Sequence, residues 1–274
     1  MNIDNLVKPT SLTEAYKLLT ADQSNTVIAG GAWLKMSKRT IKNGIDLTAI
    51  NSLKGIKEEA DVIRIGSMTT LSEIERDETL KQYYSGILPQ AIAQIMGVGL
   101  RNLVTIGGNI MSKHGFSDIA TPLLALPCTL EFHHQGILSF AEFIEQKPIK
   151  KDILKAIILE KQDGRGYFKK VKKTALDFAI LNLALTKDEN GFALAIGSRP
   201  SIAMNAKEAE TYLSQQPILN DTVIKKAATM ALKHVKLGDN PRASKAYRSA
   251  LLETYMLRGL HHLNQTNPQE GASK

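Results

Sequence analysis

The sequence has very little cysteine: Cys128 is the only one among 274 residues. The chain therefore cannot form an internal disulfide, and it cannot by itself hold an iron–sulfur cluster or a zinc ion through cysteine ligands. Cys128 stands in the apolar run Leu-Pro-Cys-Thr-Leu, where a cysteine usually behaves as a small buried hydrophobe. We predict a structural thiol rather than a nucleophile.

Aromatic residues are also scarce, at 5% of the chain, and no apolar stretch reaches the length that a membrane span needs. The first ten residues contain no apolar segment typical of signal peptides, so we expect a cytoplasmic protein without membrane insertion. The net charge is +8, and residues 147–173 contain ten Lys or Arg against three Asp or Glu. Because no nucleic-acid module accompanies this segment, we expect a solvated face or a docking surface for an acidic partner, and no nucleic-acid ligand.

Two glycine pairs carry the strongest functional signal. Gly30-Gly31 ends the apolar run 26–29, and Gly107-Gly108 lies in the motif Thr-Ile-Gly-Gly-Asn at 105–109, after a second apolar run that we expect to be a strand. Glycine lets backbone N–H groups approach a ligand closely because it has no Cβ. Two such corners favour a clamp on a diphosphate, although neither has the spacing of a Rossmann turn or a P-loop. The alternative interpretation of each pair is an ordinary tight turn.

The hydrophobic pattern along the chain predicts an α+β protein. Capping-box sequences begin helices at Ser11 and Thr70, and the second of these helices is expected to include Leu71, Ile74 and Leu80. The composition changes near residue 166, and the tail from residue 266 is polar and expected to fray. Strands are predicted at 26–29, 45–47, 62–65, 129–133, 156–159, around 167–168, 178–186 and 192–197, and further helices at 87–96, 205–213, 221–235 and 244–263.

The segment RNLVTIGGNIMSKHGFSDIATPLLAL, residues 101–126, closely resembles the FAD-binding subunit of molybdenum hydroxylases of the xanthine dehydrogenase and carbon monoxide dehydrogenase type. That family shows Arg-Asn, Thr-Ile-Gly-Gly-Asn, an Asp nine residues after the Asn, and a Pro-x-Leu-Leu-Ala-Leu-like run. Three further segments agree in order, so that the resemblance spans nearly the whole chain: Ala29-Gly30-Gly31, Tyr167-Phe168-Lys169-Lys170-Val171, and Arg242-Ala-Ser-Lys-Ala-Tyr-Arg248.

The resemblance implies a fold and a function. Residues 1–165 would form a two-lobed FAD-binding domain of the vanillyl-alcohol-oxidase/PCMH type, with lobes at about 1–55 and 56–165. Residues 166–274 would form a C-terminal domain like that of the CO dehydrogenase flavoprotein, with a small antiparallel sheet plus helices. The cofactor would be FAD. The partners would be a molybdopterin-binding large subunit and a 2Fe–2S small subunit, and this oxidoreductase subunit would pass electrons from the iron–sulfur clusters through FAD to NAD or another acceptor.

The resemblance also implies which residues hold FAD, while it implies no catalytic residue and no metal ligand in this chain. The first loop would wrap the diphosphate, the second motif would hold the same region from the other side, and Ser112 and Asp118 would lie near the flavin and the ribityl chain. Leu154 and Lys169 match positions close to the cofactor. The full set is Ile28, Ala29, Gly30, Gly31, Ala32, Trp33, Leu34, Lys35, Thr105, Ile106, Gly107, Gly108, Asn109, Ser112, Asp118, Leu154 and Lys169.

Several of these residues have a simpler structural interpretation. Lys169 could face solvent, Asp118 could cap the helix that begins at residue 119, and Trp33 could belong to the core. The chain also departs from the family pattern: Ala32-Trp33 replaces the usual Thr-Asp, and Lys113-His114-Gly115 replaces Ala-Ser-Pro. These departures put the affinity for FAD in question more than its identity.

Two other functions are consistent with the sequence. One is a stand-alone FAD-dependent oxidase or reductase, which would keep the flavin without the partner subunits. The other is a non-enzymatic basic module that binds nucleic acid or an acidic protein, with an affinity that falls steeply with salt. The sequence does not identify the substrate or the electron acceptor.

Overall fold

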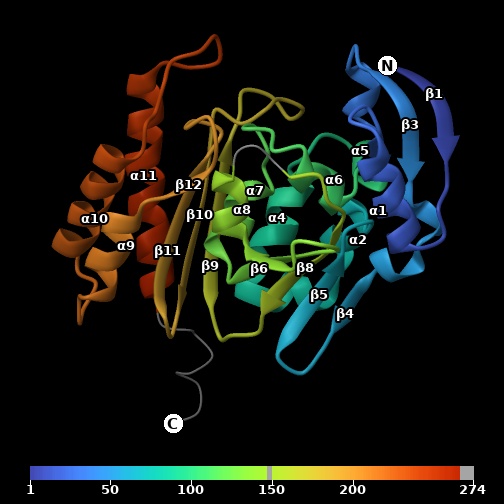
Figure 1. The fold of residues 1–274 in the computed structure, drawn as a ribbon. Helices are drawn as coiled ribbons and strands as arrows, with labels where there is room; N and C mark the ends of the chain where they lie inside the picture. Colours follow the sequence, from blue (N-terminus) through green and yellow to red (C-terminus); the bar gives the residue numbers. More distant parts are fainter. Residues whose placement is uncertain (147–149, 266–274) are drawn as a thin grey trace.

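The computed structural model describes residues 1–146 and 150–265, and the expected fraying from residue 266 lies outside the described residues. Three sheets follow one another along the chain, with 3, 5 and 4 strands. We call the parts that carry them the N-terminal unit (residues 1–55), the central unit (56–160) and the C-terminal unit (165–265). Figure 1 shows the central unit between the other two, with the helices of the C-terminal unit on the outside.

The N-terminal unit is a small parallel sheet with a helix against it. The strand order is β1-β3-β2, and the side chain of Ser11 caps the helix by accepting from the Glu14 amide. The first strand is absent from our prediction because most of its residues are exposed, so that it shows no apolar alternation. The elements are β1 (Asn2–Val7), α1 (Leu12–Ala21), β2 (Thr26–Ile28), a 3₁₀ turn (Leu34–Met36), β3 (Thr40–Asp46) and two further 3₁₀ turns (Leu47–Ala49 and Asn51–Leu53).

The central unit is a five-stranded antiparallel sheet of order β4-β5-β8-β6-β7, with helices packed against one face. Its strands are β4 (Ile56–Glu58), β5 (Val62–Gly66), β6 (Cys128–Phe132), β7 (Ile137–Ser139) and β8 (Leu154–Glu160). Its helices are α2 (Leu71–Arg76), α3 (Glu78–Gln82), α4 (Ile87–Ala93), α5 (Val98–Leu103), α6 (Ile106–Met111), α7 (Ala120–Ala125) and α8 (Phe140–Glu145), with a 3₁₀ turn at Tyr83–Gly86. Cys128 is buried, as expected, and burial raises the pKa of its thiol.

Two predictions for the central unit are wrong. The helix that begins after Thr70 ends at Arg76, and a new helix begins because the side chain of Asp77 accepts from the Leu80 amide. Gly107 and Gly108 do not follow a strand: the apolar run before them is helix α5, and the pair lies inside α6. A short apolar run of this kind does not distinguish a strand from a buried helix.

The C-terminal unit is a four-stranded antiparallel sheet of order β12-β11-β10-β9 with both faces covered. The leucines of β10 pack against α9–α11, whereas Ala184 belongs to the core of the central unit. Figure 1 shows this sheet between those helices and the central unit. Both faces of β10 are thus buried, which explains why residues 181–186 are all buried, the polar Asn182 and Thr186 included. The elements are β9 (Arg165–Val171), β10 (Leu181–Asp188), β11 (Gly191–Gly197), β12 (Met204–Asn205), α9 (Lys207–Ser214), α10 (Asp221–His234) and α11 (Lys245–Asn264).

The described part of the basic segment is largely occupied within the chain. Lys151 donates to the carbonyl oxygens of Asp22 and Gln23, both at 2.8 Å, beyond the end of α1. Lys155 pairs with Glu131, and Lys161 pairs with Glu58 at 2.8 Å. Several of its cations therefore join neighbouring segments instead of forming a free docking surface.

Arg248, the last residue of the C-terminal motif, is fully buried. Its guanidinium donates to the carbonyl oxygens of Ile180 (2.9 Å) and Gly238 (2.6 Å), and to the side-chain oxygen of Asn240 (2.7 Å). The motif therefore has a structural role: the Arg248 side chain ties α11 to the start of β10 and to the loop that precedes α11.

We expect Arg248→Met to lower the free energy of unfolding by about 3 kcal/mol, because it leaves several buried acceptors without a donor. Arg258→Met, on an exposed position of the same helix, should change it by less than about 0.5 kcal/mol. Urea unfolding of both variants measures the difference. Equal stabilities would show that the Arg248 contacts do not hold the C-terminal unit together.

Candidate functional site

We call Gly30-Gly31 the first corner and Gly107-Gly108 the second corner. The two corners are in contact. A Cβ on Gly30 would lie 1.8 Å from the carbonyl oxygen of Leu103, and a Cβ on Gly108 would lie 3.5 Å from the Cβ of Ala29. Only a residue without a side chain can therefore occupy position 30. The first loop of the N-terminal unit is seated directly on the segment that enters α6, so that the two corners form one continuous surface.

The second corner uses its backbone donors inside the protein. The amide of Ile106 donates to Thr69 (3.0 Å), and that of Gly107 donates to Ser67 (2.8 Å). The amide of Gly108 donates to the hydroxyl of Thr105, which caps α6, at 3.2 Å. A Cβ on Gly107 would approach the Ser67 carbonyl oxygen to 2.6 Å. Gly107 thus serves close packing, and the expected ligand donors of this corner are already paired.

The first corner, unlike the second, has backbone N–H groups without a protein partner among the described residues. Within residues 1–146 and 150–265, the amides of Gly30, Gly31, Ala32 and Trp33 donate to no protein acceptor. Gly31 has φ 64°, a left-handed conformation that makes a side chain unfavourable and that helps successive N–H groups to point toward one anion. A Cβ there would meet only a methyl group of Ile28, at 3.9 Å. This run of free donors is the part of the site best suited to an anion.

The other predicted residues of the two corners surround these donors. Leu34 and Lys35 lie in the 3₁₀ turn that follows, and Lys35 is exposed. Asn109 accepts a hydrogen bond from Ser117 at 2.6 Å through its side-chain oxygen. Ser112 donates to the Asn109 carbonyl at 2.7 Å. In the described part of the chain, the N–H₂ group of Asn109 has no protein acceptor, so this amide remains for a ligand.

Leu154 is not at the surface of this site. It is 4% exposed and belongs to the hydrophobic core of the central unit, at the start of β8. Strand β8 packs next to α6, so Leu154 lies beneath the second corner. Any influence of Leu154 on a ligand would act through the packing of α6.

Asp118 lies in a buried polar network between the central and C-terminal units. Its carboxylate accepts from Lys170 at 2.6 Å and from Asn182 at 3.0 Å. Burial raises the pKa of Asp118, while the Lys170 ammonium opposes that rise. Asp118 does not cap α7: the helix has Ile119 as its N-cap with no side-chain bond. Asp118 therefore joins the second motif to β9 and β10.

Lys170, which sequence reasoning missed, lies beside Asp118, whereas Lys169 does not. Successive residues of β9 alternate between half-buried and buried, so the two lysines point to opposite faces of the sheet. The ammonium of Lys169 lies 5.2 Å from the ring centre of Tyr255 in α11. The two-residue period of the strand was the available signal, because it placed Lys170 on the same face as Phe168.

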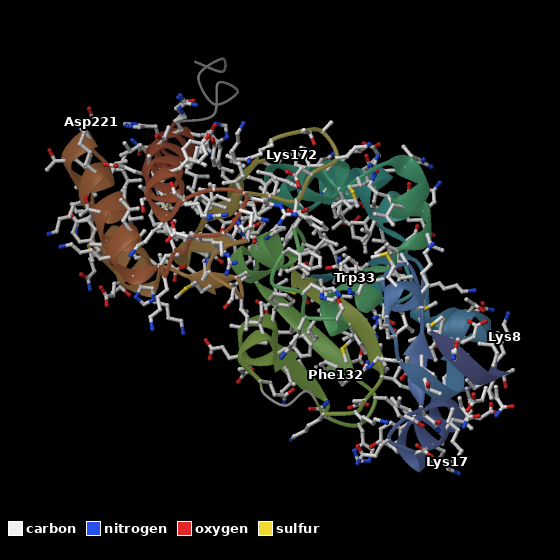
Figure 2. The ribbon with its side chains drawn as sticks, turned by 90° about the horizontal axis from the view of Figure 1, so that it is seen from above. Lys8, Lys17, Trp33, Phe132, Lys172 and Asp221 are labelled. Atoms are coloured by element: carbon white, nitrogen blue, oxygen red, sulfur yellow. The ribbon has the colours of Figure 1, made fainter. Side chains whose placement is uncertain are left out.

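Trp33 is 46% exposed and so is not a core residue. Its ring contacts His114 and Phe116, with centroids 4.8 Å and 5.1 Å away. Phe116 in turn meets Phe178, which precedes β10, at 4.7 Å. Figure 2 shows Trp33 where the N-terminal unit meets the central unit. The first corner is thus connected by aromatic rings to the C-terminal unit.

Two family profiles cover most of this chain. Residues 2–160 match the family described as the FAD binding domain in molybdopterin dehydrogenase. Residues 166–263 match the C-terminal domain of the CO dehydrogenase flavoprotein. In the part of the chain that the structure describes, no helix has the length and apolar character that crossing a membrane requires.

Several named proteins are similar to this chain along nearly their whole length. The xanthine dehydrogenase FAD-binding subunit of Escherichia coli O157:H7 is 27% identical over 265 residues, covering 89% of this chain and 90% of that subunit. The nicotinate dehydrogenase FAD-subunit of Eubacterium barkeri is 25% identical over 263 residues, covering 86% of each chain. A chain of carbon monoxide dehydrogenase from Hydrogenophaga pseudoflava superposes with a TM-score of 0.87 at 21% identity, covering 96% of this chain and 97% of that one. The last comparison establishes the fold.

We expect Lys170→Met to lower the free energy of unfolding by about 3 kcal/mol, because it leaves the buried Asp118 carboxylate without its cation. The neighbouring Lys169→Met should cost less than about 1 kcal/mol, since that ammonium is half-exposed over Tyr255. In a double-mutant cycle, Asp118→Asn and Lys170→Met together should cost less than the sum of the single changes. Similar losses for both lysines in urea unfolding would contradict the assignment of the buried pair.

Proposed function

The chain belongs to the FAD-binding family of the molybdopterin dehydrogenases, and we propose that it is the electron-carrying FAD subunit of a molybdenum hydroxylase. It is thereby the flavin-binding part of an oxidoreductase of the xanthine dehydrogenase and CO dehydrogenase type. We further propose that the FAD-binding domain ends near residue 165 and that the C-terminal domain begins at 166.

One observation supports the position of the cofactor most strongly. The four consecutive amides from Gly30 to Trp33 are free of protein acceptors. The pyrophosphate of FAD carries negative charge, and a curved run of free N–H groups is a common way of binding such an anion. Lys35, exposed one turn farther on, supplies a positive charge close by.

The donor set on the second corner suits the same ligand. Gly108 is exposed, and because it lacks a Cβ, no side chain fills the space between the two corners. The side-chain amide of Asn109 supplies hydrogen-bond donors. Thr105 holds the first turn of α6 in place and does not need to contact the ligand. We propose that residues 28–35 hold the diphosphate and that Gly108, Asn109 and Ser112 face it from the other side.

Bound FAD supplies the chemistry of accepting electrons and passing them on. The protein's own contribution is electrostatic and positional. Asp118 and Lys170 are held rigidly at the junction of the units, so they present a fixed pair of opposite charges that does not reorganise when a nearby charge changes. Residues 113–118 connect that pair to the glycine corners.

The proposed partners are a molybdopterin-binding large subunit and a 2Fe–2S small subunit. Electrons would reach this chain from the iron–sulfur clusters and leave for NAD or another acceptor. With one cysteine in its sequence, this chain cannot hold a four-cysteine cluster. The similar proteins from Escherichia coli and Eubacterium barkeri are themselves named as subunits.

Purification from the native host tests the partners. We expect the chain to copurify with molybdenum and iron, and to show flavin absorption at about 450 nm, a property of the cofactor itself. A chain that runs alone, binds FAD and turns over a small substrate would instead be a stand-alone flavoprotein. Failure to bind flavin after incubation with excess FAD would contradict the proposed function altogether.

We expect Gly108→Val to weaken FAD binding by at least about tenfold, a loss of about 1.4 kcal/mol. The new Cβ would lie 3.1 Å from the Thr105 hydroxyl and 3.5 Å from the Ala29 Cβ, so its methyl groups would occupy the space between the corners. A Cβ on Gly238 would have no neighbour within 4 Å, which makes Gly238→Val a matched control. Equilibrium dialysis with FAD measures both, and unchanged affinity in Gly108→Val would place the diphosphate elsewhere.

A further inference from the structure

Trp33, His114, Phe116 and Phe178 form one ring cluster, which we call the junction cluster. Trp33 meets His114 nearly edge to face at 4.8 Å, and His114 stacks on Phe116 at 4.8 Å with an angle of 9° between the rings. Aromatic residues make up 5% of the chain, yet three of them gather here beside one histidine. The two segments that depart from the family pattern, Ala32-Trp33 and Lys113-His114-Gly115, are therefore in direct contact.

Trp33 is placed to reach a ring that is attached to a bound diphosphate. Its backbone amide is the last of the four free donors, and nearly half of its side chain is accessible. An exposed tryptophan offers a large, stiff surface on which a planar ring stacks at little entropic cost. A purely structural role in the core would have buried this side chain.

One ring nitrogen of His114 makes no hydrogen bond in the described part of the protein. Among the described residues, its Nε2 is buried and has no hydrogen-bond partner. Burial lowers the pKa of the imidazole, so the ring is neutral near pH 7 and its two nitrogens offer one donor and one acceptor. A buried nitrogen without a partner is costly, and a ligand that bonds to it removes that cost.

The segment that carries His114 is held on both of its sides. A Cβ on Gly115 would lie 1.9 Å from the Ser201 carbonyl oxygen, so this backbone is pressed against the loop between β11 and β12. Lys113 donates to the Gln146 carbonyl at 2.7 Å and lies over the ring of Phe143 at 4.3 Å. The imidazole is thus positioned before any ligand binds, which lowers the cost of binding.

We propose that the isoalloxazine ring of the flavin lies against Trp33 and that His114 Nε2 hydrogen-bonds to the polar edge of that ring. This inference rests on the proposed function, and it adds the ring contacts to the grip on the diphosphate. The flavin, rather than the adenine, is assigned to Trp33 because the cluster leads through residues 113–118 to Asp118 and Lys170. The dimethylbenzene part of the ring suits the aromatic wall, and the pyrimidine part, with its carbonyl and N–H groups, suits His114.

The ring contact is tested by fluorescence and by binding of the full chain. Trp33 is the only tryptophan in the sequence, and a tryptophan in contact with a flavin quenches the flavin's emission by electron transfer. We expect Trp33→Leu at saturating FAD to raise the emission of bound flavin several-fold and to weaken FAD binding about tenfold, the scale of one aromatic stacking contact. The affinity for ADP, which carries the diphosphate and adenine without the flavin, should not change.

Two further variants complete the test. His114→Phe keeps the ring stack on Phe116 but removes the nitrogen, so FAD binding should weaken about fivefold, the value of one neutral hydrogen bond, again without effect on ADP. Tyr212→Leu, on α9 under the side chain of Lys226, is the aromatic control and should match the wild type. Melting temperatures of the apoproteins confirm that each variant is folded.

The outcomes separate this inference from the function on which it rests. If the wild type binds no FAD, the proposed function fails and the ring contact fails with it. If the wild type binds FAD while Trp33→Leu and His114→Phe keep wild-type affinity and emission, only the ring contact is overturned. If ADP binding falls as much as FAD binding, the cluster contacts the adenine, and the assignment to the flavin is wrong.

Discussion

The close contact between Gly30 and the Leu103 carbonyl is the constraint on which the site depends. It brings the first loop of the N-terminal unit onto the entrance of α6, and there is no room for a Cβ between them. The free amides of the first loop begin at Gly30 itself, just after β2 ends at Ile28, so they lie next to this contact. A shift of the N-terminal unit would move the donors and Trp33 together.

The two glycines of each Gly-Gly pair have different roles. Gly30 and Gly107 allow backbone to pack against backbone. A Cβ on Gly31 would meet only a methyl group of Ile28, and Gly108 is exposed, although a Cβ there would lie 3.1 Å from the Thr105 hydroxyl. One glycine of each pair therefore serves close packing, and the other lies on the proposed binding surface. The division shows why a glycine pair next to an apolar segment is a useful signal, and also why the pattern alone does not tell which amides are free.

Local signals predicted most of the elements, while long-range contacts decided the site. The caps at Ser11 and Thr70 and the long helices of the C-terminal unit could be read from the sequence, because they depend on neighbouring residues. The exposed strand β1 and the helical character of residues 98–103 could not, because the first has no apolar pattern and the second has an ambiguous one. The family resemblance brought the correct fold and cofactor. It could not indicate that the amides of α6 are internally paired, or that Lys170 and not Lys169 meets Asp118, since those facts depend on residues distant in sequence.

The buried pair of Asp118 and Lys170 has a consequence for how the two halves of the chain relate. The carboxylate belongs to the segment before α7 and the ammonium to β9, so the connection between β8 and β9 separates one from the other along the chain. Each half made on its own would present an apolar surface that carries a lone ion, and neither surface suits water or a generic hydrophobic partner. The halves are therefore complementary in charge as well as in shape, and a recombination event that exchanged one of them would have to carry over the matching charge.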